Sequence, residues 1–185
     1  SGSVTAKRGN GGIAGRLMID GTIENCTNKA AISGTGANVA GIVGAAYYTQ
    51  TGHTMLVKNC KNYGAVSGSV GGVGGIVSMS AADIEGCSNY GVVTANGDCV
   101  GGIVAEQSNS GSIIGCHNYA NVTNTSGAAT GGIVGWTRYN GGTTNYAFSE
   151  IIEFKNNTND GTISGAKFVG GIIGAIYNYG IIEGN

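Results

Sequence analysis

The chain has 185 residues, of which 37 are glycine and none is proline; 41% are hydrophobic, only 10% are charged, and the formal net charge is −1. This balance excludes a disordered chain, which would be rich in charge and proline, and it excludes collagen, because glycine shows no period of three. A net charge near zero provides no basic surface for nucleic acid, and no apolar run is long enough for membrane insertion.

Two short signatures recur along the chain. The first reads Ile-x-x-Cys-x-Asn-Tyr-Gly-x-Val-Ser/Thr, and the second reads Val-Gly-Gly-Ile-Val-Gly. The first signature occupies residues 23–33, 57–67, 84–94, 113–123 and 154–164, and the second occupies 39–44, 73–77, 100–105, 130–135 and 169–174, with a further Gly-rich copy at 11–15. Internal repeats at such a period indicate a solenoid.

The repeat has one constant half and one variable half. The Cys position and the Ile of the following Gly-rich signature are always 15 to 17 residues apart, whereas the return to the next Cys position takes 11 to 24 residues. Stacked units must keep their packed faces in register while loops on one edge grow freely. The two longest insertions, about 47–54 and 136–150, are therefore expected on one side of the structure.

Each unit is expected to form strands, because its segments are short, bounded by glycine and rich in β-branched residues. A unit of 27 to 30 residues stacked as one coil pairs in parallel with the coils above and below it. The sequence thus predicts an all-β fold: a single parallel β-helix, or β-solenoid, over residues 1–185. We expect about five coils, right-handed by the chirality of parallel crossovers, with incomplete half-units at 1–20 and 175–185.

In such a stack, each column of the aligned repeats becomes a ladder of identical side chains. Alternation along the strands predicts inward apolar columns and outward columns of hydroxyls, of charges with alternating sign, and of tyrosines that stack over the corner glycines. Two further inward columns are expected to be structural ladders. They consist of Cys26, Cys60, Cys87 and Cys116, and of Asn28, Asn62, Asn89, Asn118 and Asn159.

Groups that would indicate catalysis or metal binding are scattered. Four of the five cysteines belong to the repeat column and none forms Cys-x-x-Cys, which favours reduced, packed thiols, although disulfides between adjacent coils remain open. His53 and His117 stand in different columns, and the ten acids form no cluster of the kind that a carbohydrate-active β-helix uses. We predict no catalytic residues, no cofactor and no metal.

The variable edge collects most of the aromatic residues. The candidates for contact with a ligand or partner are Tyr47, Tyr48, Trp136, Arg138, Tyr139, Tyr146 and Tyr177. Exposed aromatic rings with an arginine can stack on a glycan or anchor a partner protein. The alternative is that these side chains fold back over the solenoid.

The segments Gly41-Ile42-Val43-Gly44 and Gly132-Ile133-Val134-Gly135, together with Asn-Tyr-Gly at 62–64 and 89–91, resemble the GLUG-motif repeats of bacterial surface proteins. These include repeats in the non-catalytic parts of immunoglobulin A metallopeptidases. The resemblance covers nearly the whole chain. It implies an extracellular or cell-surface repeat region with a structural or adhesive role; the metallopeptidase motif His-Glu-x-x-His is absent.

Three functions remain open at this point. The first is a non-enzymatic structural or adhesive module whose partners are adjacent repeats, a glycan or a host protein. The second is a subunit of a filament, because neither end resembles a polar cap and open solenoid ends invite identical subunits to stack end to end. The third is a carbohydrate-active enzyme.

Overall fold

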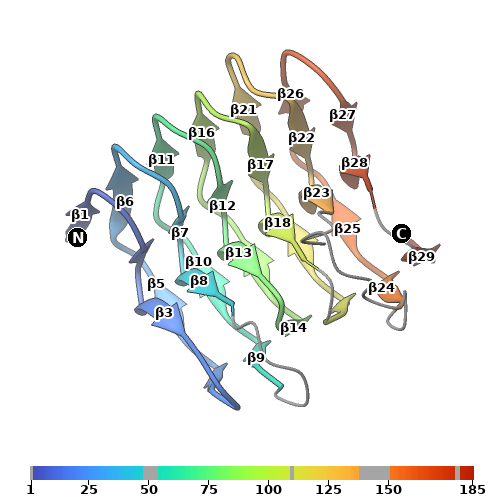
Figure 1. Cartoon of the computed structure of the whole chain (residues 1–185), viewed down its shortest axis with the longest axis horizontal. Coiled ribbons are helices and arrows are strands. Elements are labelled where there is room, and N and C mark those ends of the chain that lie inside the picture. The colour runs from blue at the N-terminus through green and yellow to red at the C-terminus, as the bar shows by residue number, and fades with distance from the viewer. Residues whose placement is uncertain (1, 48–53, 109–110, 138–150, 178–179) are drawn as a thin grey trace, which may run out of the picture.

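The computed structural model describes residues 2–47, 54–108, 111–137, 151–177 and 180–185, which form 29 strands and no helix. The strands build five parallel sheets, and each of the first five turns of the chain contributes one strand to every sheet in the same order. Figure 1 shows these turns side by side, with the N-terminus at one end of the stack and the C-terminus at the other. The predicted parallel β-solenoid is confirmed.

The first sheet contains β1 (Ser3–Ala6), β6 (Ala31–Gly34), β11 (Val66–Gly68), β16 (Val93–Ala95), β21 (Val122–Asn124) and β26 (Ile163–Ser164). The second contains β2 (Asn10–Gly11), β7 (Val39–Ala40), β12 (Val73–Gly74), β17 (Cys99–Gly101), β22 (Ala129–Gly131) and β27 (Val169–Gly170). The third contains β3 (Ala14–Leu17), β8 (Val43–Ala46), β13 (Val77–Ser80), β18 (Val104–Gln107), β23 (Val134–Thr137) and β28 (Ile173–Ile176).

The fourth sheet contains β4 (Thr22–Glu24), β9 (Leu56–Lys58), β14 (Asp83–Glu85), β19 (Ile113–Ile114), β24 (Ile152–Lys155) and β29 (Gly180–Glu183). The fifth contains β5 (Thr27–Asn28), β10 (Lys61–Asn62), β15 (Ser88–Asn89), β20 (His117–Asn118) and β25 (Thr158–Asn159). The described residues therefore make five coils of five strands and a sixth coil of four strands.

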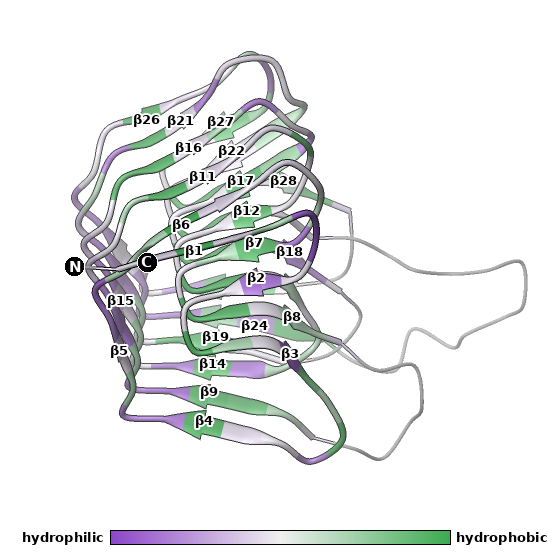
Figure 2. Cartoon of the chain, turned by 90° about the vertical axis from the view of Figure 1, so that its left-hand side faces the viewer, coloured by the Kyte–Doolittle hydropathy of each residue, from purple (hydrophilic) through white to green (hydrophobic). Residues whose placement is uncertain are grey.

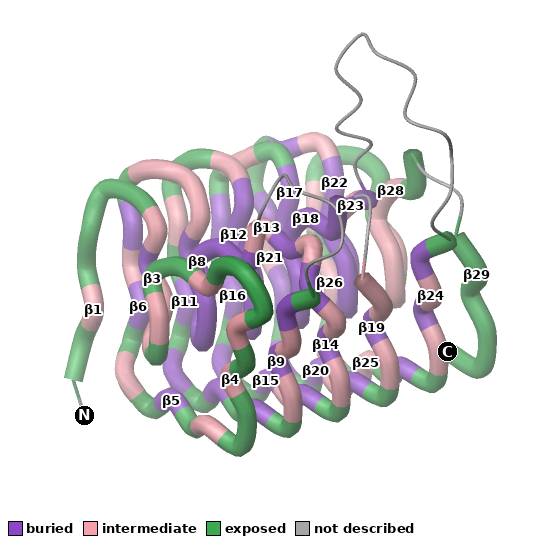
Figure 3. The backbone as a smooth tube through the Cα atoms, turned by 60° about the horizontal axis from the view of Figure 1, so that its bottom comes forward, coloured by how far each residue is buried: buried purple, intermediate pink, exposed green. Residues whose placement is uncertain are grey.

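Every sheet is paired in the register that the repeat predicts. In the first sheet, Ile32 pairs with Val66 and Val66 with Val93; in the fourth, Val57 pairs with Ile84 and Ile84 with Ile113. These side chains are buried, and the core divides into a cluster centred on the third and fourth sheets and a smaller one between the first and second. Figure 3 shows the burial falling away in the coils at the two ends.

One corner of each coil needs a left-handed backbone. Between the fourth and fifth sheets, Asn59 has φ of 51° and its equivalents Gly86 and Gly115 have φ of 58° and 62°. Asn and Gly are the residues that adopt this conformation at least cost, because a Cβ branch or a bulky side chain clashes with the backbone there. Asn or Gly also occupies the corner in the remaining coils, at Asn25, Asn156 and Gly184.

The second glycine of the Gly-Gly pair in the second signature is explained by close approach between coils. A Cβ on Gly75 would lie 2.0 Å from the Gly102 carbonyl oxygen of the next coil and 2.5 Å from Cγ of Asn89. The backbone of the second signature therefore packs directly against the asparagine column, and no side chain fits between them.

The long insertions fall at one corner, as the sequence predicts. The connection from the third sheet to the fourth is two residues long between β13 and β14 but spans residues 47–55 between β8 and β9, and 138–151 between β23 and β24. Figure 2 looks at the coils from the N-terminal end, where β3 and β8 meet β4 and β9 at this corner. A binding function carried by insertions would be confined to it.

Candidate functional site

The asparagine column forms a continuous hydrogen-bonded ladder. The side-chain amide Nδ2 of Asn28 donates to Oδ1 of Asn62 at 2.8 Å, and the same contact links Asn62 to Asn89 at 2.9 Å and Asn89 to Asn118 at 2.9 Å. The ladder ends with Asn118 Nδ2 donating to Asn159 Oδ1 at 2.8 Å. Each Nδ2 also donates to the carbonyl two residues ahead, as Asn89 does to Gly91 at 2.9 Å. The ladder therefore satisfies the buried backbone at the turn between the fifth and first sheets.

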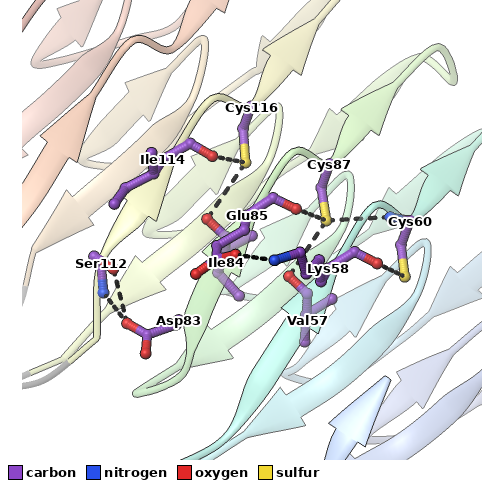
Figure 4. A network of polar contacts seen from close by, with 10 residues as sticks. All are labelled: Val57, Lys58, Cys60, Asp83, Ile84, Glu85, Cys87, Ser112, Ile114 and Cys116. Carbon is purple, nitrogen blue, oxygen red and sulfur yellow. Dashed lines mark hydrogen bonds and ion pairs between the residues drawn. The ribbon is translucent and has the colours of Figure 1, made fainter. Parts of the chain in front are cut away.

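The four column cysteines donate hydrogen bonds to backbone carbonyl groups. Figure 4 shows Cys87 with its Sγ directed at two carbonyls: Glu85 O on its own coil at 3.4 Å and Val57 O on the preceding coil at 3.5 Å. Cys116 makes the same pair of contacts. All five cysteines are free thiols, and only Cys26 in the first coil is not fully buried. Hydrogen bonding to Cys116 and burial both raise the pKa of Cys87, so its thiol stays protonated and unreactive.

Asn157 shows what the fold requires at this column. It occupies the cysteine position in the next coil, where its Nδ2 donates to the Ile113 carbonyl at 2.8 Å and its Oδ1 accepts from the Cys116 amide at 2.9 Å. Asn185 repeats the arrangement with Phe154 O. The cysteine column thus requires a side chain that fits and that donates a hydrogen bond to the carbonyl of the preceding coil, and it does not require a thiol.

The outer charges and hydroxyls pair between coils. Lys58 Nζ lies 2.7 Å from Glu85 Oε2 of the next coil. Lys155 Nζ lies 3.9 Å from Glu183 of the next coil and 2.9 Å from Glu153 of its own strand. Figure 4 also shows Asp83 Oδ1 accepting from the Ser112 amide and hydroxyl at 2.7 and 2.8 Å. Within the described ranges, no group of three or more His, Cys, Asp or Glu side chains is placed to hold a metal ion.

The tyrosine column stacks on itself rather than on the corner glycines. The ring centroids of Tyr63 and Tyr90 are 4.7 Å apart and those of Tyr90 and Tyr119 are 4.5 Å apart, with nearly parallel planes. His117 covers the remaining face of Tyr119 at 3.6 Å and pairs with Asp160 at 2.8 Å. Parallel strands lie about 4.8 Å apart, which places the equivalent rings of successive coils at stacking distance.

The structure brings together two of the seven aromatic and arginine candidates. The Trp136 and Tyr177 rings meet edge to face with centroids 5.9 Å apart, and the Tyr177 amide donates to Thr137 Oγ1 at 2.9 Å. Tyr47 precedes the insertion after β8 and is half-buried. Tyr48, Arg138, Tyr139 and Tyr146 lie outside the described residues. A site made by the insertions therefore stays a prediction.

Comparison with protein-family models, with curated proteins and with solved structures found no match to this chain. No helix in the described part of the chain is long and apolar enough to cross a membrane. Membership of the GLUG-motif repeats therefore stays a proposal.

Proposed function

We propose that this chain is a non-enzymatic structural or adhesive repeat module of an extracellular or cell-surface protein, of the GLUG-motif kind. The observation that carries the proposal is the continuity of the ladders. Core columns such as Val57–Ile84–Ile113 and the asparagine ladder run through the coils in register, while every insertion falls at one corner. This construction gives a stiff rod whose length follows from the number of coils.

A register-matched deletion tests the module directly. Removing residues 66–92 joins Ala65 to Val93, which occupies the same place one coil later. The shortened chain is expected to fold cooperatively and to lose about 4.8 Å of length, which small-angle scattering and circular dichroism measure. Removing residues 66–85 instead is the control, because it breaks the register and should prevent folding. Equal behaviour of the two deletions would contradict the modular rod.

A filament built by end-to-end stacking is the second candidate, because core columns are exposed at both ends. Ile13 in the first coil is 44% exposed and Ile182 in the last is 49% exposed, whereas their interior equivalents Ile76 and Ile84 are 0% exposed. Stacking of a further coil on either end would bury this apolar surface.

One feature weighs against close stacking of identical copies. Glu183 of one copy would face Glu24 of the next, since both occupy the outer column of the fourth sheet. Sedimentation and electron microscopy of Glu183→Lys against the unmodified chain test the idea: filaments should lengthen in the variant, and particles that stay short in both would end it.

A further inference from the structure

The outer face of the first sheet differs in charge from the outer face of the fourth. Its first outward row consists of small hydroxyl residues, namely Thr5, Ser33, Ser67, Thr94, Thr123 and Ser164. A second row, two residues further along each strand, contains Thr35, Ser69, Asn96 and Thr125, with Lys7 at its N-terminal end. The fourth sheet instead presents Glu24, Lys58, Glu85, Lys155 and Glu183.

A groove runs between these two rows, parallel to the solenoid axis. It has a volume of about 360 Å³, and its lining extends from Thr5 in the first coil to Thr125 in the fifth. Gly34, Gly68 and Ala95 line it between the rows, and no charged residue lines it. The strands concerned form the upper row of arrows in Figure 1, from β1 to β21. The side-chain positions between the rows are directed into the core, where a Cβ on Gly68 would meet Val73 Cγ2, so the floor of the groove is backbone.

The hydroxyls of the groove retain hydrogen-bonding capacity. In the first row, Ser67 and Thr94 are exposed and their hydroxyls have no hydrogen-bond partner in the portion of the chain that the structure describes. In the second row, Ser69 Oγ donates to the Gly34 carbonyl at 3.4 Å and Thr125 Oγ1 to the Ala95 carbonyl at 3.3 Å. These two oxygens can still accept, so the groove offers both donors and acceptors without charge.

The composition of the groove narrows the class of occupant. An ionic ligand would lose its hydration and meet no opposite charge. A protein partner would be expected to find aromatic or arginine anchors, and none lines the groove. A linear chain of linked hydroxyl-bearing rings, in contrast, meets a similar set of hydroxyls at each coil, about every 4.8 Å. Many weak contacts then add along one rigid surface that needs no ordering on binding.

We propose that this groove on the first sheet binds an uncharged linear glycan that lies parallel to the solenoid axis. The ligand spans several coils, and the Ser67 and Thr94 hydroxyls hydrogen-bond to its hydroxyl groups. The proposal goes beyond the structural role, which does not depend on it, and it places recognition on a regular face rather than on the insertions.

Native affinity electrophoresis of the full chain tests the site. The gels contain mixed-linkage β-glucan, xylan, mannan or dextran as neutral probes, and alginate as the charged probe. At least one neutral glycan should retard the chain and alginate should not. Thr94→Val removes one hydroxyl at nearly constant volume and should weaken binding at least about threefold, and Thr94→Lys should weaken it at least about tenfold.

Thr158→Lys is the matched control, because Thr158 is an exposed strand threonine of the fifth sheet, away from the groove. It should bind like the unmodified chain, and circular dichroism should show all variants folded. Retardation by no neutral glycan, equal retardation of Thr94→Lys, or binding to alginate alone would overturn the proposal. Inhibition of ice growth that Thr94→Lys abolishes, without glycan binding, would instead assign the hydroxyl rows to ordered water. None of these outcomes bears on the rod, which the coil deletion tests separately.

Discussion

Replacing Asn89 by alanine removes the centre of the asparagine ladder. The side chain is 0% exposed and makes four hydrogen bonds: it donates to Gly91 O and Asn118 Oδ1, and it accepts from Asn62 Nδ2 and the Gly91 amide. At about 1 kcal/mol each, the loss is about 4 kcal/mol, because water does not reach the groups left behind. This is a large part of the stability of a typical domain, about 5 to 15 kcal/mol.

Equilibrium unfolding in urea, followed by circular dichroism, measures the effect of Asn89→Ala. Asn121→Ala is the control, since Asn121 is exposed and, among the described residues, its side chain accepts only the Thr162 amide; the loss of stability should be at most about 1 kcal/mol. Asn89→Asp should be worse than Asn89→Ala, because a buried carboxylate has no proton to donate to Gly91 O. A loss in Asn89→Ala no larger than in Asn121→Ala would refute the ladder as a source of stability.

Other changes test the packing and the titrating groups. Gly75→Ala should destabilise by at least about 3 kcal/mol, because the new Cβ meets Gly102 O, whereas Gly171→Ala, in the same column of the last coil, meets nothing within 4 Å and should cost under about 1 kcal/mol in the same urea titration. A thiol reagent should modify Cys26 in the folded chain and reach Cys60, Cys87 and Cys116 only after unfolding; rapid labelling of all four would contradict their burial. Hydrogen bonding to Glu85 raises the pKa of Lys58 above its ordinary 10.5, and hydrogen bonding to Cys87 raises the pKa of Cys60 above its ordinary 9.0. Groups with a raised pKa stabilise the fold at pH values below their ordinary pKa, and this stabilisation is lost as the pH rises through the raised pKa. The urea midpoint should therefore fall above about pH 9. Lys58→Gln should make the fall shallower in the range above the ordinary pKa of lysine.

The solenoid could be predicted from the sequence because the repeat aligns residues that share one environment. Ile32, Val66 and Val93 are adjacent in the alignment and adjacent in the first sheet. The corner that takes insertions follows from the same alignment, since the segment between the third and fourth sheets varies far more in length than the rest of the repeat. In a solenoid, residues that share a column of the repeat alignment also contact one another in space, which is rarely true of a globular fold.

What could not be predicted arises between columns or at the ends. The strand Ser3–Ala6 has no flanking copy of the first signature, and its pairing with β6 shows only in three dimensions. The groove depends on the depth between two rows of side chains, which a one-dimensional alignment does not contain. The left-handed corner was not recognised in the sequence because both asparagine and glycine occur there, as in Asn59 and Gly86, and only their shared positive φ reveals the common cause.

The substitution of asparagine for cysteine within one column bears on the chemistry of the whole chain. Cys116 and Asn157 follow each other in the stack, and both satisfy the carbonyl of a preceding coil, Ile84 O and Ile113 O respectively. A column that accepts an amide cannot depend on thiolate nucleophilicity or on disulfide formation in that coil. The asparagine ladder is likewise structural, because its side chains hydrogen-bond to the backbone of the turn and to one another. The inward ladders are therefore committed to the scaffold, and recognition of a ligand has to come from the outer rows or from the corner that varies.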